Sequence, residues 1–274
     1  MTSSAHVNPP PAAAHATAPT SARAQAVADT LASLATLAAL LGLWWLAAHR
    51  GWVSKVFLPT PEAAWASLAD GLAGGELAAY TAATLGRMLL GWGLAALLGV
   101  ALGALICSSA SARVWLQPML EFLRPLPASA VMPLAIALFG LSGGMVLAVV
   151  AFGAMWPVLL ATLHGLASVH PRLTEVAAAL QLTRTETLLK IGLPQALPDI
   201  LAALRLALTV SLIVSVVGEM IASQPGLGQA ILLAARAVRA SDLFAGIVLL
   251  GAIGFASNAL LALAERHLLR WQRP

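Results

Sequence analysis

Charged side chains are scarce in this chain: Asp, Glu, Lys and Arg make up only 9% of its 274 residues, whereas hydrophobic residues make up 60%. Soluble domains usually carry about 25% charged residues, so this scarcity excludes an ordinary soluble domain and indicates an integral membrane protein. Cysteine is scarcer still. The single Cys107 lies within an apolar run, so the sequence predicts no disulfide framework and no metal-binding cluster.

Motifs for nucleotide hydrolysis and for catalysis are missing as well. The P-loop pattern does not occur, so we do not expect the chain to hydrolyse ATP itself. Ser/His/Asp and paired-carboxylate patterns do not rise above chance in the apolar runs, which argues against a membrane-embedded enzyme. Gly226-Leu227-Gly228 begins like a dinucleotide fingerprint, but no third glycine follows and no strand precedes it, so we interpret it as a turn.

Long apolar runs dominate the rest of the chain, and they predict an all-α protein with six transmembrane helices. Each run has about the length that crosses a bilayer as a helix. The third and fourth spans share one uncharged stretch between Arg124 and Arg172, which a glycine-rich break at 140–144 divides into a hairpin. In chain order the expected spans are 30–48, the stretch between Arg87 and Arg113, the two arms of that hairpin, about 200–222, and 243–264.

The basic residues stand singly at the ends of these runs and give a net charge of +4. This distribution is typical of topology control rather than of nucleic-acid binding. With the N-terminus in the cytoplasm, ten Lys and Arg residues fall on the inner side, Arg124 among them, and five on the outer side, Arg87 among them. The excess of inner basic residues predicts a cytoplasmic N-terminus.

These features predict the organisation of the whole chain. Residues 1–28 have too few large apolar side chains to fold alone, so we expect a disordered cytoplasmic tail. The first transmembrane helix, 29–50, and a periplasmic loop with an amphipathic segment, 51–84, follow. Residues 85–268 form a core of five transmembrane helices that contains a polar loop at 170–195, and 269–274 form a cytoplasmic tail.

The polar loop contains an island, EVAAALQLTRTETLLKIGLP at 175–194, that no span could hold. Each of its charges would cost roughly 2.5–3.5 kcal/mol at the centre of a bilayer. Pro171 fits the first position of a helix, Thr183 with Glu186 reads as a capping box, and Pro194 is expected to end the second helix. We predict two short amphipathic helices outside the bilayer that a partner grips, with passive packing on the membrane as the alternative.

Three prolines and one carboxylate in the spans are candidates for a translocation path. Pro125, Pro127 and Pro133 crowd the entrance of the third span, and prolines free carbonyls that are tolerated at depth where they line a cavity. A plain helix start explains Pro125 and Pro127 equally well. Glu219 is the one carboxylate inside a predicted span, which makes it a functional candidate by default. A glutamate at the level of the lipid headgroups is the alternative.

The second span carries a GxxxG pair, Gly99 and Gly103, together with Gly91 and Gly93. Small residues let helix backbones approach closely, so this face is expected to pack on another helix. The partner is either a helix of the same bundle or a second copy of the chain.

The island resembles the EAA loop of ABC-importer permeases, in which Glu-Ala-Ala is followed by a glycine and then by Ile-x-Leu-Pro. Glu175 stands at the glutamate, and Ile191, Leu193 and Pro194 match the closing residues, whereas Gln181 stands where the family usually has glycine. A glycine there would cap the first helix in a left-handed conformation, so Gln181 either holds that conformation at a cost or remodels the turn. Further segments are similar to the sulfonate/nitrate/taurine branch: LPTP at 58–61, RPLPASAVMPLAIALFG at 124–140, GLPQALPDILAALRLAL at 192–208 and GEMIASQPGLG at 218–228.

The resemblance implies the MetI-like permease fold, with loop 170–195 as a cytoplasmic coupling loop, in a protein of the bacterial inner membrane. It implies a non-catalytic subunit without bound cofactors, since ATP and Mg²⁺ belong to the partner. Its implied partners are a second copy of the chain, a cytoplasmic ABC ATPase dimer, a periplasmic or lipoprotein solute-binding protein and membrane lipid, but no nucleic acid. The implied ATPase-coupling residues are Glu175, Ala177, Ala178, Gln181, Leu188, Ile191, Leu193 and Pro194.

The cargo that the resemblance implies is a small anion such as an aliphatic sulfonate, taurine or nitrate, although relatives carry other small molecules such as vitamin precursors. The alternative function is a self-sufficient secondary transporter or channel driven by an ion gradient. That reading needs buried ionisable relays or inverted repeats, and the sequence offers one candidate carboxylate and no convincing repeat. A passive membrane scaffold is a third alternative.

Overall fold

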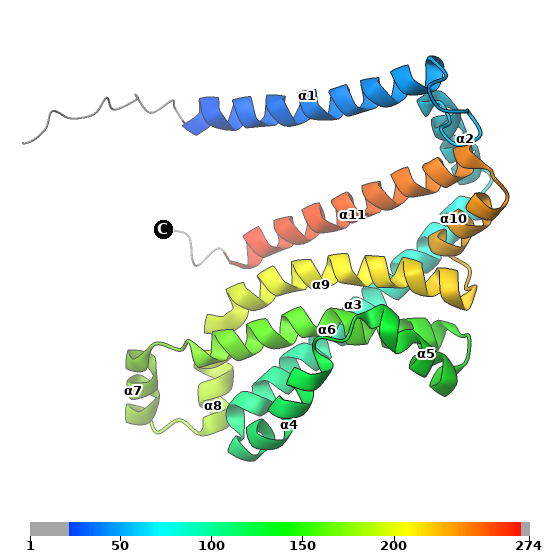
Figure 1. The fold of residues 1–274 in the computed structure, drawn as a ribbon. Helices are drawn as coiled ribbons and strands as arrows, with labels where there is room; N and C mark the ends of the chain where they lie inside the picture. Colours follow the sequence, from blue (N-terminus) through cyan, green and yellow to red (C-terminus); the bar gives the residue numbers. More distant parts are fainter. Residues whose placement is uncertain (1–21, 270–274) are drawn as a thin grey trace, which may run out of the picture. The chain divides into compact units, whose positions relative to one another are not determined.

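The computed structural model describes residues 22–269, and its regular elements in that range are all helical (Figure 1). The expected all-α fold is therefore confirmed. The helices are α1 (Ala22–His49), α2 (Pro61–Ala73), α3 (Glu76–Ser108), α4 (Ala110–Leu123), α5 (Ala128–Phe139), α6 (Gly143–Ala167), α7 (Pro171–Ala179), α8 (Arg184–Thr187), the π-helical turn η1 (Leu188–Gly192), α9 (Leu193–Ala222), α10 (Leu227–Arg236) and α11 (Ala240–Leu268).

Five stretches of helix are long and apolar enough to cross a membrane: one in α1, α3, α6, the continuous run from α8 through α9, and α11. A sixth crossing exists only if α4 and α5 together count as one span, and these two helices meet at an angle of 104°. The expected third span is thus a broken one, because α5 has 12 residues and reaches only about 18 Å. The break falls at Pro125–Pro127: Arg124 still has helical backbone, whereas Pro127, the N-cap of α5, is extended with φ of −65° and ψ of 139°.

Two helix starts differ from the expected boundaries. Helix α1 begins at Ala22, inside the segment expected to be a tail, whereas residues 1–21 lie outside the described residues. Helix α3 begins at Glu76, so Arg87 lies well inside a helix rather than at its outer end. The chain divides into two compact units, Met1–Val53 and Ser54–Pro274, and all contacts described below belong to the second unit.

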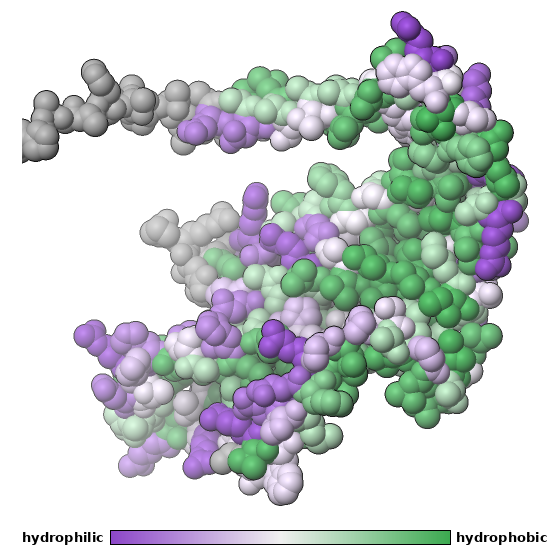
Figure 2. Space-filling view, in the orientation of Figure 1, coloured by the Kyte–Doolittle hydropathy of each residue, from purple (hydrophilic) through white to green (hydrophobic). Residues whose placement is uncertain are grey.

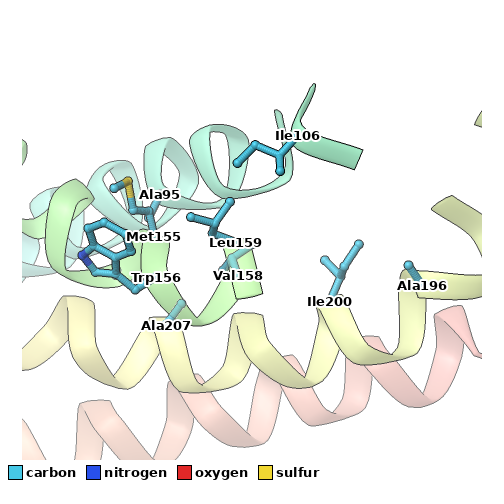
Figure 3. Packing of buried hydrophobic residues seen from close by; sticks show 10 residues of the cluster. Ala95, Ile106, Met155, Trp156, Val158, Leu159, Ala196, Ile200 and Ala207 are labelled. Carbon is cyan, nitrogen blue, oxygen red and sulfur yellow. The ribbon is translucent and has the colours of Figure 1, made fainter. Parts of the chain in front are cut away.

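Helices α3, α6 and α9 form the centre of the second unit. A Cβ atom added to Gly99 would lie 2.8 Å from Cβ of Val158, and one added to Gly103 would lie 2.7 Å from Cβ of Thr162. These glycines therefore let α3 approach the backbone of α6, which confirms the expected close packing and identifies its partner as a helix of the same chain. Helix α9 closes the other side of α6, where buried side chains from the three helices meet (Figure 3).

Candidate functional site

Helix α7 is the first helix of loop 170–195, for which the name coupling loop is kept because the resemblance implies that role. Local contacts fix α7 at both ends. Pro171 occupies the first helical position, as predicted, and Nδ1 of His170 accepts a hydrogen bond from the backbone N–H of Arg172 at 3.2 Å. At the other end, N–H of Gln181 donates to the carbonyl of Ala178, and N–H of Leu182 donates to the carbonyl of Ala177, both at 3.0 Å. This pair of bonds is a Schellman motif.

Gln181 adopts the left-handed conformation that the motif needs, with φ of 55°. The left-handed turn that a glycine would form easily is thus present with a glutamine in place. A non-glycine residue costs roughly 1–2 kcal/mol in this conformation, so the turn stores strain that the two hydrogen bonds and the packing of α7 offset. The angle between α7 and α8 follows from this turn.

Helix α8 begins with the predicted capping box. The hydroxyl of Thr183 accepts from N–H of Glu186 at 3.2 Å, and the Glu186 carboxylate accepts from N–H of Thr183 at 3.0 Å. Nζ of Lys190 also donates to Glu186 at 2.9 Å. The polar first turn of α8 precedes the apolar part of the helix. The hydrogen bonds from Lys190 and Thr183 lower the pKa of the Glu186 carboxyl to about 2. The carboxylate therefore stays ionised and keeps the box closed.

Pro194 does not end the second helix, contrary to expectation. Helix α8 continues through η1 into α9, and N–H of Leu193 donates to the carbonyl of Leu188, five residues back. A proline in an α-helix lacks an N–H and its ring collides with the carbonyl four residues earlier. The wider π-helical turn just before Pro194 changes the hydrogen-bond register there, so the helix runs on into the membrane-spanning part of α9.

The coupling loop turns one apolar face toward the chain and another outward. Leu180 is 65% exposed, and Leu173, Val176 and Leu189 are exposed with it. Ala177 is only 4% exposed, so it packs on this chain. Hydrophilic residues gather over α7 and α8 (Figure 2, lower left). Of the other expected coupling residues, Glu175, Ala178, Gln181 and Pro194 are exposed, whereas Leu188, Ile191 and Leu193 are half-buried.

Both ends of the coupling loop are packed against each other. A Cβ atom on Gly165 of α6 would lie 2.6 Å from Cβ of Ala196 of α9, and Nε2 of Gln195 donates to the carbonyl of Ser168 at 3.1 Å. Behind the loop lies a cavity of about 370 Å³, into which Cys107 at the end of α3 also faces. The loop is therefore supported by α3, α6 and α9 together.

Pro125 and Pro127 lie at the bend between α4 and α5, and Pro133 lies inside α5. Pro125, Pro127 and Pro133 are all exposed, and Pro127 lines a cavity of about 500 Å³ that Arg124, Trp156 and residues of α9 also line. Within the described chain, Pro125 and Pro133 lie outside that lining. Since Trp156 lies near the middle of α6, the bend places Arg124 beside the middle of a span. Arg124 therefore lies in a turn beside the middle of a span, and not at the inner end of a span as the topology count assumed. Removing Arg124 and Arg87 from the count leaves the excess of inner basic residues unchanged.

Glu219, the remaining path candidate, is fully buried within the chain, near the end of α9. Its Oε1 lies 2.6 Å from Nη1 of Arg87, and its Oε2 accepts from the hydroxyl of Thr84 at 2.9 Å and from N–H of Gly228 at 3.0 Å. Gly228 belongs to the first turn of α10, whose N–H groups favour a negative charge. Glu219 thus ties α9 to α3 and to the start of α10.

The glycines after α9 make room for this carboxylate. A Cβ atom on Gly226 would overlap the carboxylate of Glu219, and one on Gly228 would overlap the carbonyl of Val216. The turn expected at Gly226-Leu227-Gly228 is only partly present: Gly226 is an extended residue before α10, whereas Leu227 and Gly228 already belong to the first turn of that helix. Sequence patterns did not reveal the pairing of Arg87 with Glu219, because the two residues lie 132 positions apart. Sequence patterns also gave no role to Trp156.

Known proteins resemble this chain in sequence. Residues 95–273 match the family described as "Binding-protein-dependent transport system inner membrane component". The chain is 33% identical to the putative aliphatic sulfonates transport permease protein of Bacillus subtilis (strain 168), over 86% of this chain and 85% of that protein. It is 32% identical to the taurine transport system permease protein of Escherichia coli (strain K12), over 87% and 89% of the two chains.

One solved structure shares the fold. It is described as "Crystal structure of an amino acid ABC transporter with histidines", and it matches with a TM-score of 0.59 and 22% identity over 73% of this chain and 97% of that chain. Members of the matched family are non-catalytic membrane subunits without bound cofactors, which work with an ATPase and a binding protein. This chain belongs to that family, the multi-pass permease subunits of bacterial ABC importers.

Proposed function

We propose that two copies of this chain form the translocation path for a small anionic solute of the aliphatic sulfonate, taurine or nitrate class. In this proposal the coupling loop lies in the cytoplasm and docks into a groove of the partner ATPase, and a binding protein delivers the solute from outside. The names of the two relatives, a sulfonate and a taurine permease, support the class of solute.

The observation that carries the proposal is the outward apolar face of the coupling loop. Leu180 and Leu189 expose large apolar side chains on the part of the molecule where hydrophilic residues gather (Figure 2). Burying such a side chain in a partner contributes about 1.5–3 kcal/mol, so a groove that covers several of them would hold the loop firmly. Glu175 is exposed on α7, the helix that ends at Leu180, and would pair with basic or polar groups of the groove.

The packing behind the loop explains how a pull on it would reach the membrane. Gly165 and Ala196 join the end of α6 to the start of α9 at close range, and Gly192 is held in the same way against Leu166. A movement of α7 and α8 would therefore tilt α6 and α9 as one body. Because α8 runs into α9 without a break at Pro194, the second arm of the loop acts as a rigid extension of a span.

The test is a reconstitution of the chain with its cognate ATPase and binding protein in proteoliposomes. We expect Glu175→Arg to abolish the stimulation of ATP hydrolysis by the loaded binding protein, because the reversed charge would meet the same partner groups. Glu76→Arg, which reverses an exposed glutamate at the start of α3, serves as the control and should leave stimulation intact. Normal stimulation in Glu175→Arg would contradict the docking role, and uptake without ATP would favour an ion-coupled transporter.

The orientation of the loop has its own test. In a Cys107→Ser background, Thr183→Cys should react with a membrane-impermeant maleimide only from the cytoplasmic side. Labelling from the outside alone would place the loop beyond the reach of an ATPase and refute the coupling role.

A further inference from the structure

The cavity at the bend between α4 and α5 lies beside the middle of the spans. It has a volume of about 500 Å³, which is within the range of small-molecule sites. Gly153 and Trp156 from the middle of α6 form one wall, Val210 and Val214 from the middle of α9 form another, and the bend itself brings Arg124 to the cavity. The cavity therefore lies at the depth where a solute would have to pass.

The polar groups of this cavity are hydrogen-bond donors. Among residues 22–269, neither the guanidinium of Arg124 nor the hydroxyl of Ser129 has a hydrogen-bond or ion-pair partner within the chain. Trp156 is 8% exposed, and its indole N–H is buried without a partner. Buried donors are almost always satisfied in folded proteins, so this N–H, on a side chain that lines the cavity, lacks the acceptor it would normally have.

A carboxylate lies close to Arg124, but it does not neutralise the cavity. Glu121 and Arg124 both line a smaller neighbouring cavity of about 120 Å³, on the other side of Trp156. The Glu121 carboxylate accepts from Nε2 of Gln117 at 3.0 Å and forms no ion pair with Arg124 in the described chain. Of the described residues that line the larger cavity, Arg124 alone is charged, which leaves that cavity positive.

The remaining lining is apolar. Val210, Ile213, Val214 and Val217 cover the α9 side, and Met132 lies on the α5 side. A ligand that suits both parts carries an anionic head with several acceptor oxygens and a short apolar tail. A carboxylate or sulfonate head accepts charge-assisted hydrogen bonds from a guanidinium, and such bonds are roughly twice as strong as hydrogen bonds between neutral groups.

We propose that this cavity is a transit subsite for small organic anions with a short aliphatic tail, such as an alkanesulfonate. Arg124 and Ser129 hold the head, the Trp156 N–H supplies a third donor after a small rotation, and the valines of α9 face the tail. This inference rests on the proposed function of the chain as an anion importer. It adds the residues that select the anion inside the membrane, independently of the binding protein.

The test measures binding to the permease with its ATPase in nanodiscs, without the binding protein. The probe is 3,3,3-trifluoropropane-1-sulfonate, whose ¹⁹F resonance broadens when the probe binds, and 3,3,3-trifluoropropan-1-ol is the uncharged comparison. We expect the sulfonate to bind and the alcohol to bind at least tenfold more weakly. Arg124→Gln should weaken sulfonate binding about tenfold or more, Arg124→Lys should restore part of it, and Trp156→Phe should weaken it about threefold to tenfold.

Arg113→Gln is the matched control, because it removes the same charge from α4 outside the cavity lining and should leave binding unchanged. Equal loss in Arg113→Gln and Arg124→Gln, or equal binding of the sulfonate and the alcohol, would overturn the subsite. The failure of the subsite is distinguishable from that of the proposed function. ATP-dependent anion uptake with binding that ignores Arg124 refutes the subsite alone, and Arg124-dependent binding without ATP-dependent uptake refutes the importer alone.

Discussion

Replacing Arg87 by methionine should destabilise the fold strongly, because it leaves the Glu219 carboxylate buried without its counter-charge. Glu219 is fully buried, and Arg87 approaches it at 2.6 Å with a side chain that is only 18% exposed. Thr84 and Gly228 would still donate to the carboxylate, but both are neutral donors. Removing one partner of a buried ion pair typically costs about 3–5 kcal/mol.

The double variant measures how much the ion pair itself contributes to stability, separately from the other contacts of the two side chains. Glu219→Gln alone leaves Arg87 without a counter-charge. Whichever way the new amide points, its NH₂ group faces another donor, either Arg87 on one side or Thr84 and Gly228 on the other. Arg87→Met with Glu219→Gln removes both charges, so its cost should be smaller than the sum of the two single costs by about 1.5 kcal/mol or more. Thr84 and Gly228 can still donate to the amide oxygen in the double variant.

The assay is thermal unfolding of the purified permease in detergent, followed by size-exclusion chromatography of the remaining folded protein. A loss of about 3–5 kcal/mol corresponds to a fall in Tm of roughly 6–20 °C for a chain of this size. Arg205→Met is the control, since Arg205 pairs with Glu265 but is 44% exposed, and its loss should cost about 1 kcal/mol or less. An unchanged Tm in Arg87→Met and in Glu219→Gln, with uptake lost in both, would refute the structural role and return Glu219 to the translocation path.

Two further predictions concern backbone positions. Gly99→Ala should destabilise the bundle by about 1–3 kcal/mol, because its Cβ atom would lie 2.8 Å from Val158, whereas Gly93→Ala has open space and should be neutral or stabilising; the same thermal assay distinguishes them. Gln181→Gly should slow hydrogen exchange at the Leu182 amide by about fivefold to thirtyfold, because it relieves a left-handed glutamine that costs roughly 1–2 kcal/mol, and Gln181→Val should accelerate it. Faster exchange in Gln181→Gly would show that the strain is absent.

Local signals in the sequence predicted the coupling loop well. Pro171 as a first helical residue and the capping box of Thr183 and Glu186 each depend on residues within a few positions of each other, and both are present. The pairing of Gly99 and Gly103 with another helix also follows from spacing along one face. These are features in which the chemistry of a residue and its neighbours decides the conformation.

Features that depend on distant partners were not predictable in the same way. Pro194 was expected to end a helix, but packing of Gly165 against Ala196 holds the chain in line and the π-helical turn accommodates the ring. The partner of Glu219 could not be found by pattern, since Arg87 reads as a residue at a helix end. The bend of 104° between α4 and α5 was likewise hidden, because prolines predict a break but not its direction.

The charges inside the apolar helices differ in whether the chain satisfies them, and this difference separates structural from functional positions. Three groups donate hydrogen bonds to Glu219, and one of them is the positively charged Arg87. Arg205 pairs with Glu265 between α9 and α11. Arg124, an exposed residue at the bend between α4 and α5, has no such partner in the described chain and lines a cavity with Trp156, whose indole N–H is unpaired. A buried charge that finds its counter-charge within the fold holds helices together, whereas one that faces an open cavity gains its partner from what enters. The two classes of variant should therefore differ in kind: Arg87→Met lowers Tm, while Arg124→Gln leaves Tm nearly unchanged and weakens anion binding.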